Sequence, residues 1–216
     1  MATTNPNLME RAKDGVIGTI KGTGEIFTAV TDTVSDVLTH ALAGTGRVGG
    51  AATHAASDVA RGVIRGTSEV GGDLGSAARG MVVGALRGTK DIGTGTLELV
   101  TDTTAAVVRE AAEVGSGLGQ AGRGAVEGAI DGARELGLDV ADAASAAATG
   151  AIRAAGQVSD AATREVTNAV TGVVDGVKVV AKSPFTKGRS EAAKGDASKP
   201  DAKSQGDAPA RKTTKP

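Results

Sequence analysis

Apolar and polar residues follow each other along this chain with a spacing of three or four, and the whole pattern recurs every 22 residues. Within each 22-residue block, apolar residues fall at positions 2, 5, 9, 13, 16 and 20 or 21, so the block is an eleven-residue repeat used twice. This spacing gives about 3.67 residues per turn, close to the 3.6 residues of an α-helix. The pattern therefore predicts an all-α protein of amphipathic helices.

One apolar stripe is predicted to run along these helices. The repeats begin at Gly22 and continue to Asp175 without a change of register, and their fifth and twenty-first positions are apolar in every copy. The stripe consists of Ile26, Leu42, Val48, Ile64, Val70, Leu86, Ile92, Val108, Val114, Ile130, Leu136, Ile152, Val158 and Val174. We expect it to face a lipid surface or a partner, because a helix buries its apolar face against something.

The arrangement of the helices has more than one solution at this stage. The unchanged register favours long continuous helices from residue 15 to 181, since turns between helices usually tolerate insertions. Glycine clusters at 44–50, 71–75, 93–95 and 115–124 instead allow turns between helices of about 18 residues, which would give stacked helical hairpins. A 22-residue β-solenoid coil is a third alternative, because Val, Thr and Gly are frequent.

Composition divides the chain into three segments. We expect a flexible N-terminus over residues 1–14, the helical repeat region over 15–181 and a disordered tail over 182–216. Pro184 would stop a helix, and the residues beyond it include almost no bulky apolar side chain. Residues 1–181 contain 15 Lys and Arg against 21 Asp and Glu, whereas residues 182–216 contain 9 against 4. An acidic body therefore precedes a basic tail.

The residue types that carry most enzyme chemistry are scarce. The chain has no Cys, which excludes a disulfide framework and a thiolate metal site. Its two histidines, His40 and His54, lie 14 residues apart without an acidic cluster around them. The glycine-rich phrases that begin at Gly44 and Gly115 lack the GK[ST] ending of a phosphate-binding loop. We therefore expect no catalytic residue, no metal and no cofactor.

The polar face and the glycines carry two further patterns. Ion pairs four residues apart are predicted between Lys21 and Glu25, Arg65 and Glu69, Arg87 and Asp91, and Arg109 and Glu113. GxxxG pairs occur at Gly18 and Gly22, Gly62 and Gly66, Gly84 and Gly88, and Gly128 and Gly132. Such pairs allow helices to approach closely, but they also lower helix propensity.

Two phrases resemble known lipid-surface repeats. "LRGTKDIGTGTLELVTDTT", residues 86–104, resembles the repeat region of perilipins, and "EVTNAVTGVVDGVKVVAKS", residues 165–183, resembles that of synucleins. The resemblance implies a chain that is disordered in solution and becomes helical on lipid. Those families carry many lysines beside the apolar face, whereas this body is acidic, which favours neutral, poorly packed surfaces over anionic bilayers. The repeats also resemble those of late embryogenesis abundant proteins and, more weakly, phasins.

These patterns lead to one expected function and two alternatives. We expect a non-enzymatic coat on a lipid droplet, membrane or storage granule, peripheral and cytoplasmic, because no signal peptide and no transmembrane run is present. The first alternative is a self-associating structural protein, built as a right-handed coiled coil or a helical stack. The second is a protectant like the late embryogenesis abundant proteins. No specific nucleic-acid partner is expected, since the tail has no aromatic residue after Phe185 to stack on bases.

Overall fold

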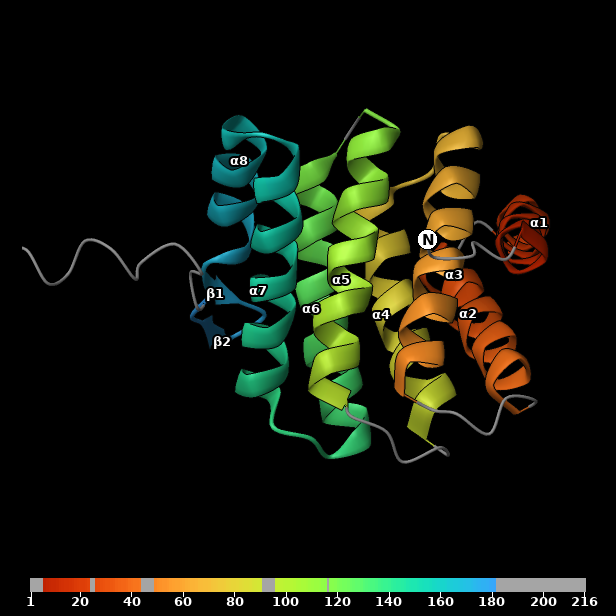
Figure 1. Ribbon diagram of the computed structural model, residues 1–216, viewed down its shortest axis with the longest axis horizontal. Coiled ribbons are helices and arrows are strands. Elements are labelled where there is room, and N and C mark those ends of the chain that lie inside the picture. Colours follow the sequence, from red (N-terminus) through yellow and green to blue (C-terminus); the bar gives the residue numbers. More distant parts are fainter. Residues whose placement is uncertain (1–5, 24–25, 44–48, 91–95, 116, 182–216) are drawn as a thin grey trace, which may run out of the picture. The chain divides into compact units, whose positions relative to one another are not determined.

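The computed structural model describes residues 6–23, 26–43, 49–90, 96–115 and 117–181, and these residues form eight helices and one β-hairpin in a single compact unit (Figure 1). The helices are α1 (Pro6–Thr23), α2 (Ile26–Ala43), α3 (Gly49–Glu69), α4 (Leu74–Lys90), α5 (Thr96–Glu113), α6 (Leu118–Leu136), α7 (Val140–Val158) and α8 (Asp160–Val170). The hairpin consists of β1 (Gly172–Val174) and β2 (Val177–Val179).

The prediction of an all-α protein built from 22-residue repeats is confirmed, and its arrangement is the stacked-hairpin alternative. The chain turns once per repeat, so a continuous helix from 15 to 181 does not form. The turn after α6 shows the cause. Gly137 adopts the left-handed conformation with φ 71°, and Leu138 N donates to Ala133 O at 2.9 Å. Asp139 then caps α7 by accepting from Asp142 N at 2.8 Å.

The N-terminal boundary differs from the prediction. Helix α1 begins at Pro6, inside the segment 1–14 that the sequence was expected to leave flexible. Proline suits the first position of a helix, because its φ is already helical and its missing N–H would have no partner there. Ala12 and Val16 are then fully buried and fix the helix to its neighbours. The predicted disordered tail, 182–216, lies outside the described residues.

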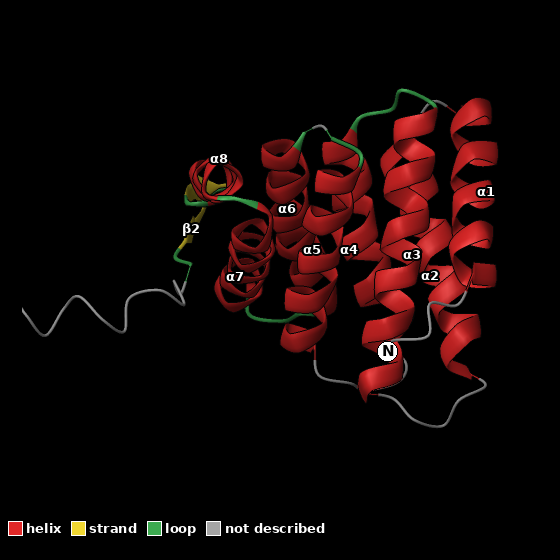
Figure 2. Ribbon diagram, turned by 45° about the horizontal axis from the view of Figure 1, so that its top comes forward, coloured by secondary structure: helices red, strands yellow, loops and turns green. Residues whose placement is uncertain are grey.

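The helices form two rows. Helices α1, α3, α5 and α7 pack against one another in that order, and α2, α4, α6 and α8 do the same in the second row. Consecutive helices also touch and thereby join the rows, as Figures 1 and 2 show. Each helix therefore lies beside the helix that comes two repeats later in the chain. No helix within the described ranges is long and apolar enough to span a bilayer.

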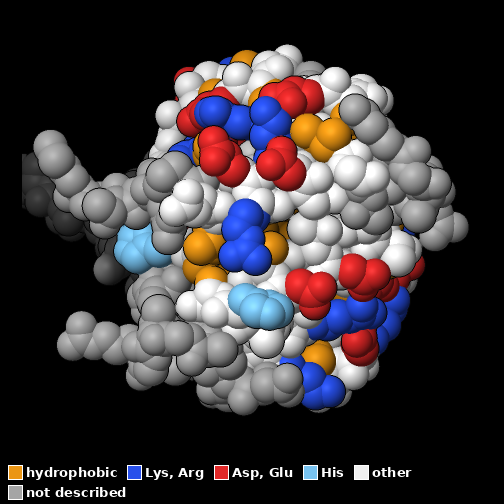
Figure 3. All heavy atoms as spheres, turned by 90° about the vertical axis from the view of Figure 1, so that its right-hand side faces the viewer, with side chains coloured by type: hydrophobic (Ala, Val, Ile, Leu, Met, Phe, Trp, Pro, Cys, Tyr) orange, Lys and Arg blue, Asp and Glu red, His pale blue; other side chains and the backbone are white. Residues whose placement is uncertain are grey.

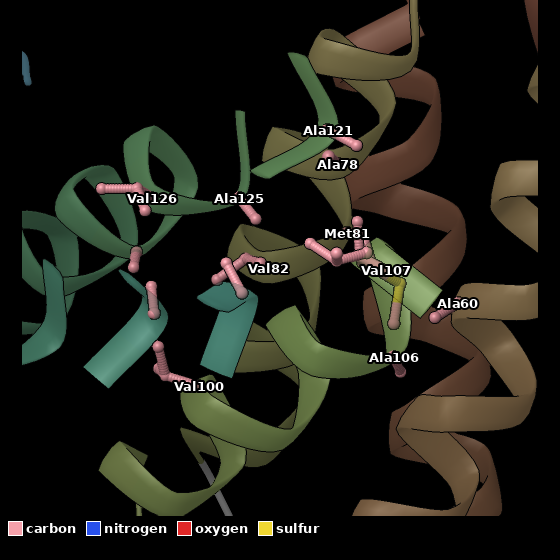
Figure 4. Packing of buried hydrophobic residues seen from close by; sticks show 14 of the residues in the cluster. Ala60, Ala78, Met81, Val82, Val100, Ala106, Val107, Ala121, Ala125 and Val126 are labelled. Atoms are coloured by element: carbon pink, nitrogen blue, oxygen red, sulfur yellow. The ribbon is translucent and has the colours of Figure 1, made fainter. Parts of the chain in front are cut away.

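The core between the rows is built from small side chains. Most of its buried residues are Ala and Val, and the largest fully buried side chains are those of Leu38, Ile64, Met81, Leu86 and Ile130. Figure 4 shows Met81 and Val82 among alanines and valines of neighbouring helices. Small residues let helices approach closely, but each one buries little apolar surface. The stability of the fold is therefore spread over many small contacts.

A β-hairpin occupies residues that the repeat pattern assigned to helix. Gly172 pairs with Val179 and Val174 with Val177, and the strands are joined by Asp175 and Gly176. Asp175 has φ 48° and Gly176 has φ 77°, the conformation that a two-residue hairpin turn of this kind requires. The helical prediction is therefore wrong for 172–179, because the Asp-Gly turn between valines outweighs the eleven-residue spacing.

Candidate functional site

The stripe residues at the twenty-first block position lie inside the stack. All six whose side chains are described are buried: Ile64, Leu86, Val108, Ile130, Ile152 and Val174. The first five lie on α3 to α7 and Val174 lies on β1, so each repeat contributes one residue to an apolar column inside the stack. In this folded state the column contacts other helices of the same chain. Its expected contact with lipid stays a prediction.

The stripe residues at the fifth block position lie at helix ends. Ile26, Val114 and Leu136 are partly buried and pack against the core, and Val70 is partly buried in the turn after α3. Val158, the last residue of α7, is 46% exposed. The side chain of Leu42 and the residues Val48 and Ile92 lie outside what the structure describes. The two halves of the predicted stripe therefore differ, because residues at the twenty-first position are buried in the core, whereas those at the fifth position lie at its edge.

Glycine pairs form the contacts between neighbours within a row. A Cβ added to Gly84 of α4 would lie 2.7 Å from Thr31 O of α2, and one on Gly88 would lie 3.0 Å from Ser35 O. The pair on α3 packs against α1 in the same way, since a Cβ added to Gly62 would contact Met9 O and one added to Gly66 would contact Lys13 O. The pair on α6, Gly128 and Gly132, packs against α4. These GxxxG pairs therefore serve close helix packing.

Glu69 and Glu113, each predicted to pair four residues away within its own helix, pair instead with neighbours within a row, whereas Glu25 and Asp91 of the other predicted pairs lie outside the described residues. Arg65 of α3 contacts Glu113 of α5 at 2.8 Å, and Arg87 of α4 contacts Glu135 of α6 at 2.9 Å. Both partners lie 48 positions further along the chain. Glu69, the predicted partner of Arg65, instead contacts Lys13 of α1 at 2.8 Å. The long basic side chains reach across to the neighbouring helix, where an acid stands at the same height.

Glu110 is the buried charged residue of the described chain, and sequence reasoning did not single it out. Its side chain is 2% exposed, and Oε1 accepts from Arg61 Nε of α3 at 3.0 Å. Oε2 lies 3.9 Å from Arg65 Nε and has no hydrogen-bond partner. Burial raises the pKa of Glu110 above its ordinary value, and the positive charge of Arg61 opposes this shift. A signal was present, because Glu110 stands at the first block position, where Gly66, Gly88 and Gly132 stand in other repeats.

The outer face of the helical hairpin formed by α1 and α2 is polar. Its exposed side chains include Asn7, Glu10, Arg11 and Asp14 of α1 and Thr28, Asp32, Asp36, Thr39 and His40 of α2. On the face turned to the viewer in Figure 3, acidic and basic side chains gather and hydrophobic atoms occur only in small groups. A polar outer face on the terminal repeat is the usual device that stops a helical stack from extending onto another copy.

Two further features of the described surface are the histidines and a pocket between α5 and α7. Both histidines are exposed, and His40 Nδ1 lies 2.7 Å from Asp36 O of its own helix. Within the described ranges, His, Asp and Glu form no group of three that could hold a metal ion. A pocket of about 490 Å³ between α5 and α7 is lined by Leu97, Thr101 and Ala146, among others. The Thr101 hydroxyl there already donates to Leu97 O at 2.9 Å.

Comparison with known proteins adds a likeness in structure. No family model and no curated protein matches this chain. Among solved structures it is similar to the crystal structure of the de novo designed helical repeat protein DHR7, with a TM-score of 0.46 and 19% sequence identity. The match covers 76% of this chain and 89% of that one.

Proposed function

We propose that this chain is a non-enzymatic coat protein of a lipid or storage-granule surface, peripheral and cytoplasmic, which keeps its apolar column inside the stack until the surface is met. On contact the stack opens, and the column turns from neighbouring helices to lipid. The observation that supports this proposal is the burial of all six described residues at the twenty-first block position among small side chains. The same residues would then stabilise both states.

The composition of the core supports an opening of this kind. Glycine forms the close contacts of α1 with α3, of α2 with α4 and of α4 with α6, and it gives up little apolar area when the helices separate. The described core includes no aromatic side chain. A lipid surface would take up Ile64, Leu86, Ile130 and Ile152 at once, and many modest contacts in register would sum to a useful affinity. The distributed stripe therefore suits a surface better than a single small ligand.

Self-association through the ends of the stack is the competing function. The polar outer face of α1 and α2 argues against it at that end of the stack, because an extending stack needs an apolar face there. Sedimentation at increasing protein concentration without lipid distinguishes the two. A coat protein stays at constant mass under these conditions, whereas a self-associating protein grows with concentration.

A reversible staple tests whether opening is needed for binding. A Cβ on Gly119 of α6 would lie 3.5 Å from the Cβ of Ala169 on α8, which is within the range for a disulfide. Because the chain has no other Cys, the variant Gly119→Cys/Ala169→Cys forms this staple alone. The matched control is Gly119→Ser/Ala169→Ser, which has side chains of similar size and cannot crosslink. Binding is measured by flotation with triacylglycerol emulsion coated with phosphatidylcholine.

We expect the unstapled chain and the serine control to float with the emulsion. The oxidised staple should bind at least threefold more weakly, because α6 and α8 can no longer separate, and a reductant should restore binding. If neither protein floats, the proposed surface function is wrong. If the oxidised and reduced forms bind equally well, binding does not require α6 and α8 to separate, and opening of the whole stack fails as the mechanism.

A further inference from the structure

Helix α5 departs from the glycine rule that its neighbours follow. Helices α3, α4 and α6 carry a GxxxG pair at the nineteenth and first block positions, and each pair packs against the previous helix of its row. In α5 these two positions are held by Ala106 and Glu110. Among the glycines whose surroundings the structure describes, none lies between α3 and α5. The contact between these two helices is therefore built in another way.

Charged side chains take part in the contact between α3 and α5. The carboxylate of Glu110 meets Arg61 and Arg65 there, yet Oε2 has no hydrogen bond. Residues three, four and seven apart share one side of a helix, so Thr103 and Ala106 lie on the same side of α5 as Glu110. The hydroxyl of Thr103 is also buried without a hydrogen-bond partner. Buried oxygens without hydrogen-bond partners weaken a contact between helices, because they gain hydrogen bonds to water when the helices separate.

The second row has no comparable break. Gly80 and Gly84 of α4 meet the backbone of α2, and Gly124 and Gly128 of α6 meet the backbone of α4. The row of α2, α4 and α6 is thus joined by close backbone contacts on both sides of α4. If α3 and α5 part, this row can hold the two halves together and bend as a hinge.

We propose that the stack opens first between α3 and α5, while α2, α4 and α6 stay packed and act as the hinge. Opening there exposes the side of α5 that carries Ala106 and the side of α3 that packs against it; Ala106 and the stripe residue Ile64 of α3 are both buried in the closed stack. The position of the opening rests on the contacts alone. Its use at a lipid surface rests on the proposed function.

Single cysteines measure the opening directly, because the chain has none of its own. The probe is Ala106→Cys, whose parent side chain is 1% exposed, and the matched control is Ala125→Cys on α6, between Gly124 and Gly128, whose parent side chain is 0% exposed. The full-length variants react with a thiol reagent in native buffer without lipid. A second probe, Thr103→Cys, replaces Ala106→Cys if that variant does not fold by circular dichroism.

We expect the thiol at position 106 to react at least tenfold faster than the thiol at 125, with a rate that depends little on low concentrations of urea. Equal rates for both thiols, or no reaction of either before global unfolding, would overturn the proposal. Reaction of both variants in strong denaturant verifies that each thiol is competent. Because no lipid is present, this result is independent of the flotation experiment, and either proposal can fail alone.

Discussion

Arg65 contacts Glu113, 48 residues further along the chain, and does not contact Glu69, which stands one helical turn away. The reason is that α3 and α5 lie side by side in one row, so an acid two repeats later is placed at the height of the Arg65 guanidinium. Arg87 and Glu135 repeat this relation one helix later. The ion pairs therefore report the stacking order of the helices.

A double-mutant cycle should detect this relation. Alanine substitutions at Arg65 and Glu113, singly and together, should give a coupling of roughly 0.2 to 1 kcal/mol in the free energy of unfolding, because both side chains are half exposed. The measurement is urea denaturation at low salt. The cycle between Arg65 and Glu69 is the control and should give a coupling near zero. A larger coupling to Glu69 would mean that the helices are not stacked in this order.

Glycines that lie against the backbone of a neighbouring helix should be important for the stability of the stack. Gly84→Ala should lower the free energy of unfolding by about 1 to 3 kcal/mol, because the new methyl would lie 2.7 Å from Thr31 O. No atom from outside the neighbouring backbone of α1 lies within 4 Å of the Cβ position of Gly18, so Gly18→Ala should raise the free energy of unfolding by up to about 1 kcal/mol. Urea denaturation of both variants measures the contrast. Equal stabilisation by both substitutions would contradict the close contact.

Glu110 should give the stability of the protein a characteristic dependence on pH. Its pKa is raised by burial above the ordinary value of 4.5, so the folded state holds the proton more tightly than the unfolded state does. The resulting stabilisation is complete below the ordinary pKa and is lost as the pH rises through the raised pKa.

Glu110→Gln isolates this effect, because glutamine keeps the shape and does not titrate. The free energy of unfolding of the wild type, minus that of Glu110→Gln, should fall as the pH rises from about 4 to 8. Urea denaturation of both proteins at each pH gives this difference. A difference that is constant over the range, or that grows with pH, would show that burial does not dominate at Glu110.

The hairpin turn should need its glycine. Gly176→Ala should cost about 1 kcal/mol, because φ of 77° places an added Cβ too close to the following carbonyl oxygen. Val174 and Val179 of the two strands are buried, so the cost should appear in the unfolding of the whole compact unit. Urea denaturation measures it, with Gly18→Ala as the reference for an unstrained glycine. A stabilised Gly176→Ala variant would argue for a helical conformation of this segment.

Much of this fold can be predicted from the sequence, because the buried side of each helix depends on the local spacing of apolar residues. The apolar residues at the twenty-first position, such as Ile64 and Ile130, were predicted as one column and are buried as one column. The partner of that column could not be predicted in the same way. An amphipathic helix presents the same face to lipid, to another copy or to its own neighbours, and spacing does not distinguish among them.

Other features depend on distant contacts or on a competing local signal. Positions 4 and 48 residues after Arg65 both carry an acid, so the sequence alone favours the nearer Glu69, whereas packing selects Glu113. The exchange of glycine for Glu110 is visible in the repeats, but its burial depends on Arg61 of another helix. In the last repeat, Asp175 and Gly176 carry a strong turn signal that the longer periodicity concealed.

The arrangement in two rows also restricts how a chain of this kind can change its length. Adding or deleting one repeat of 22 residues between Arg87 and Glu135 would move the helix of Glu135 to the opposite row and reverse its direction, so that the two side chains would no longer stand beside each other. Adding or deleting 44 residues restores both the row and the direction. Variants of this chain should therefore gain or lose helices in pairs, and a change by an odd number of repeats should leave one helix without a counterpart in the opposite row.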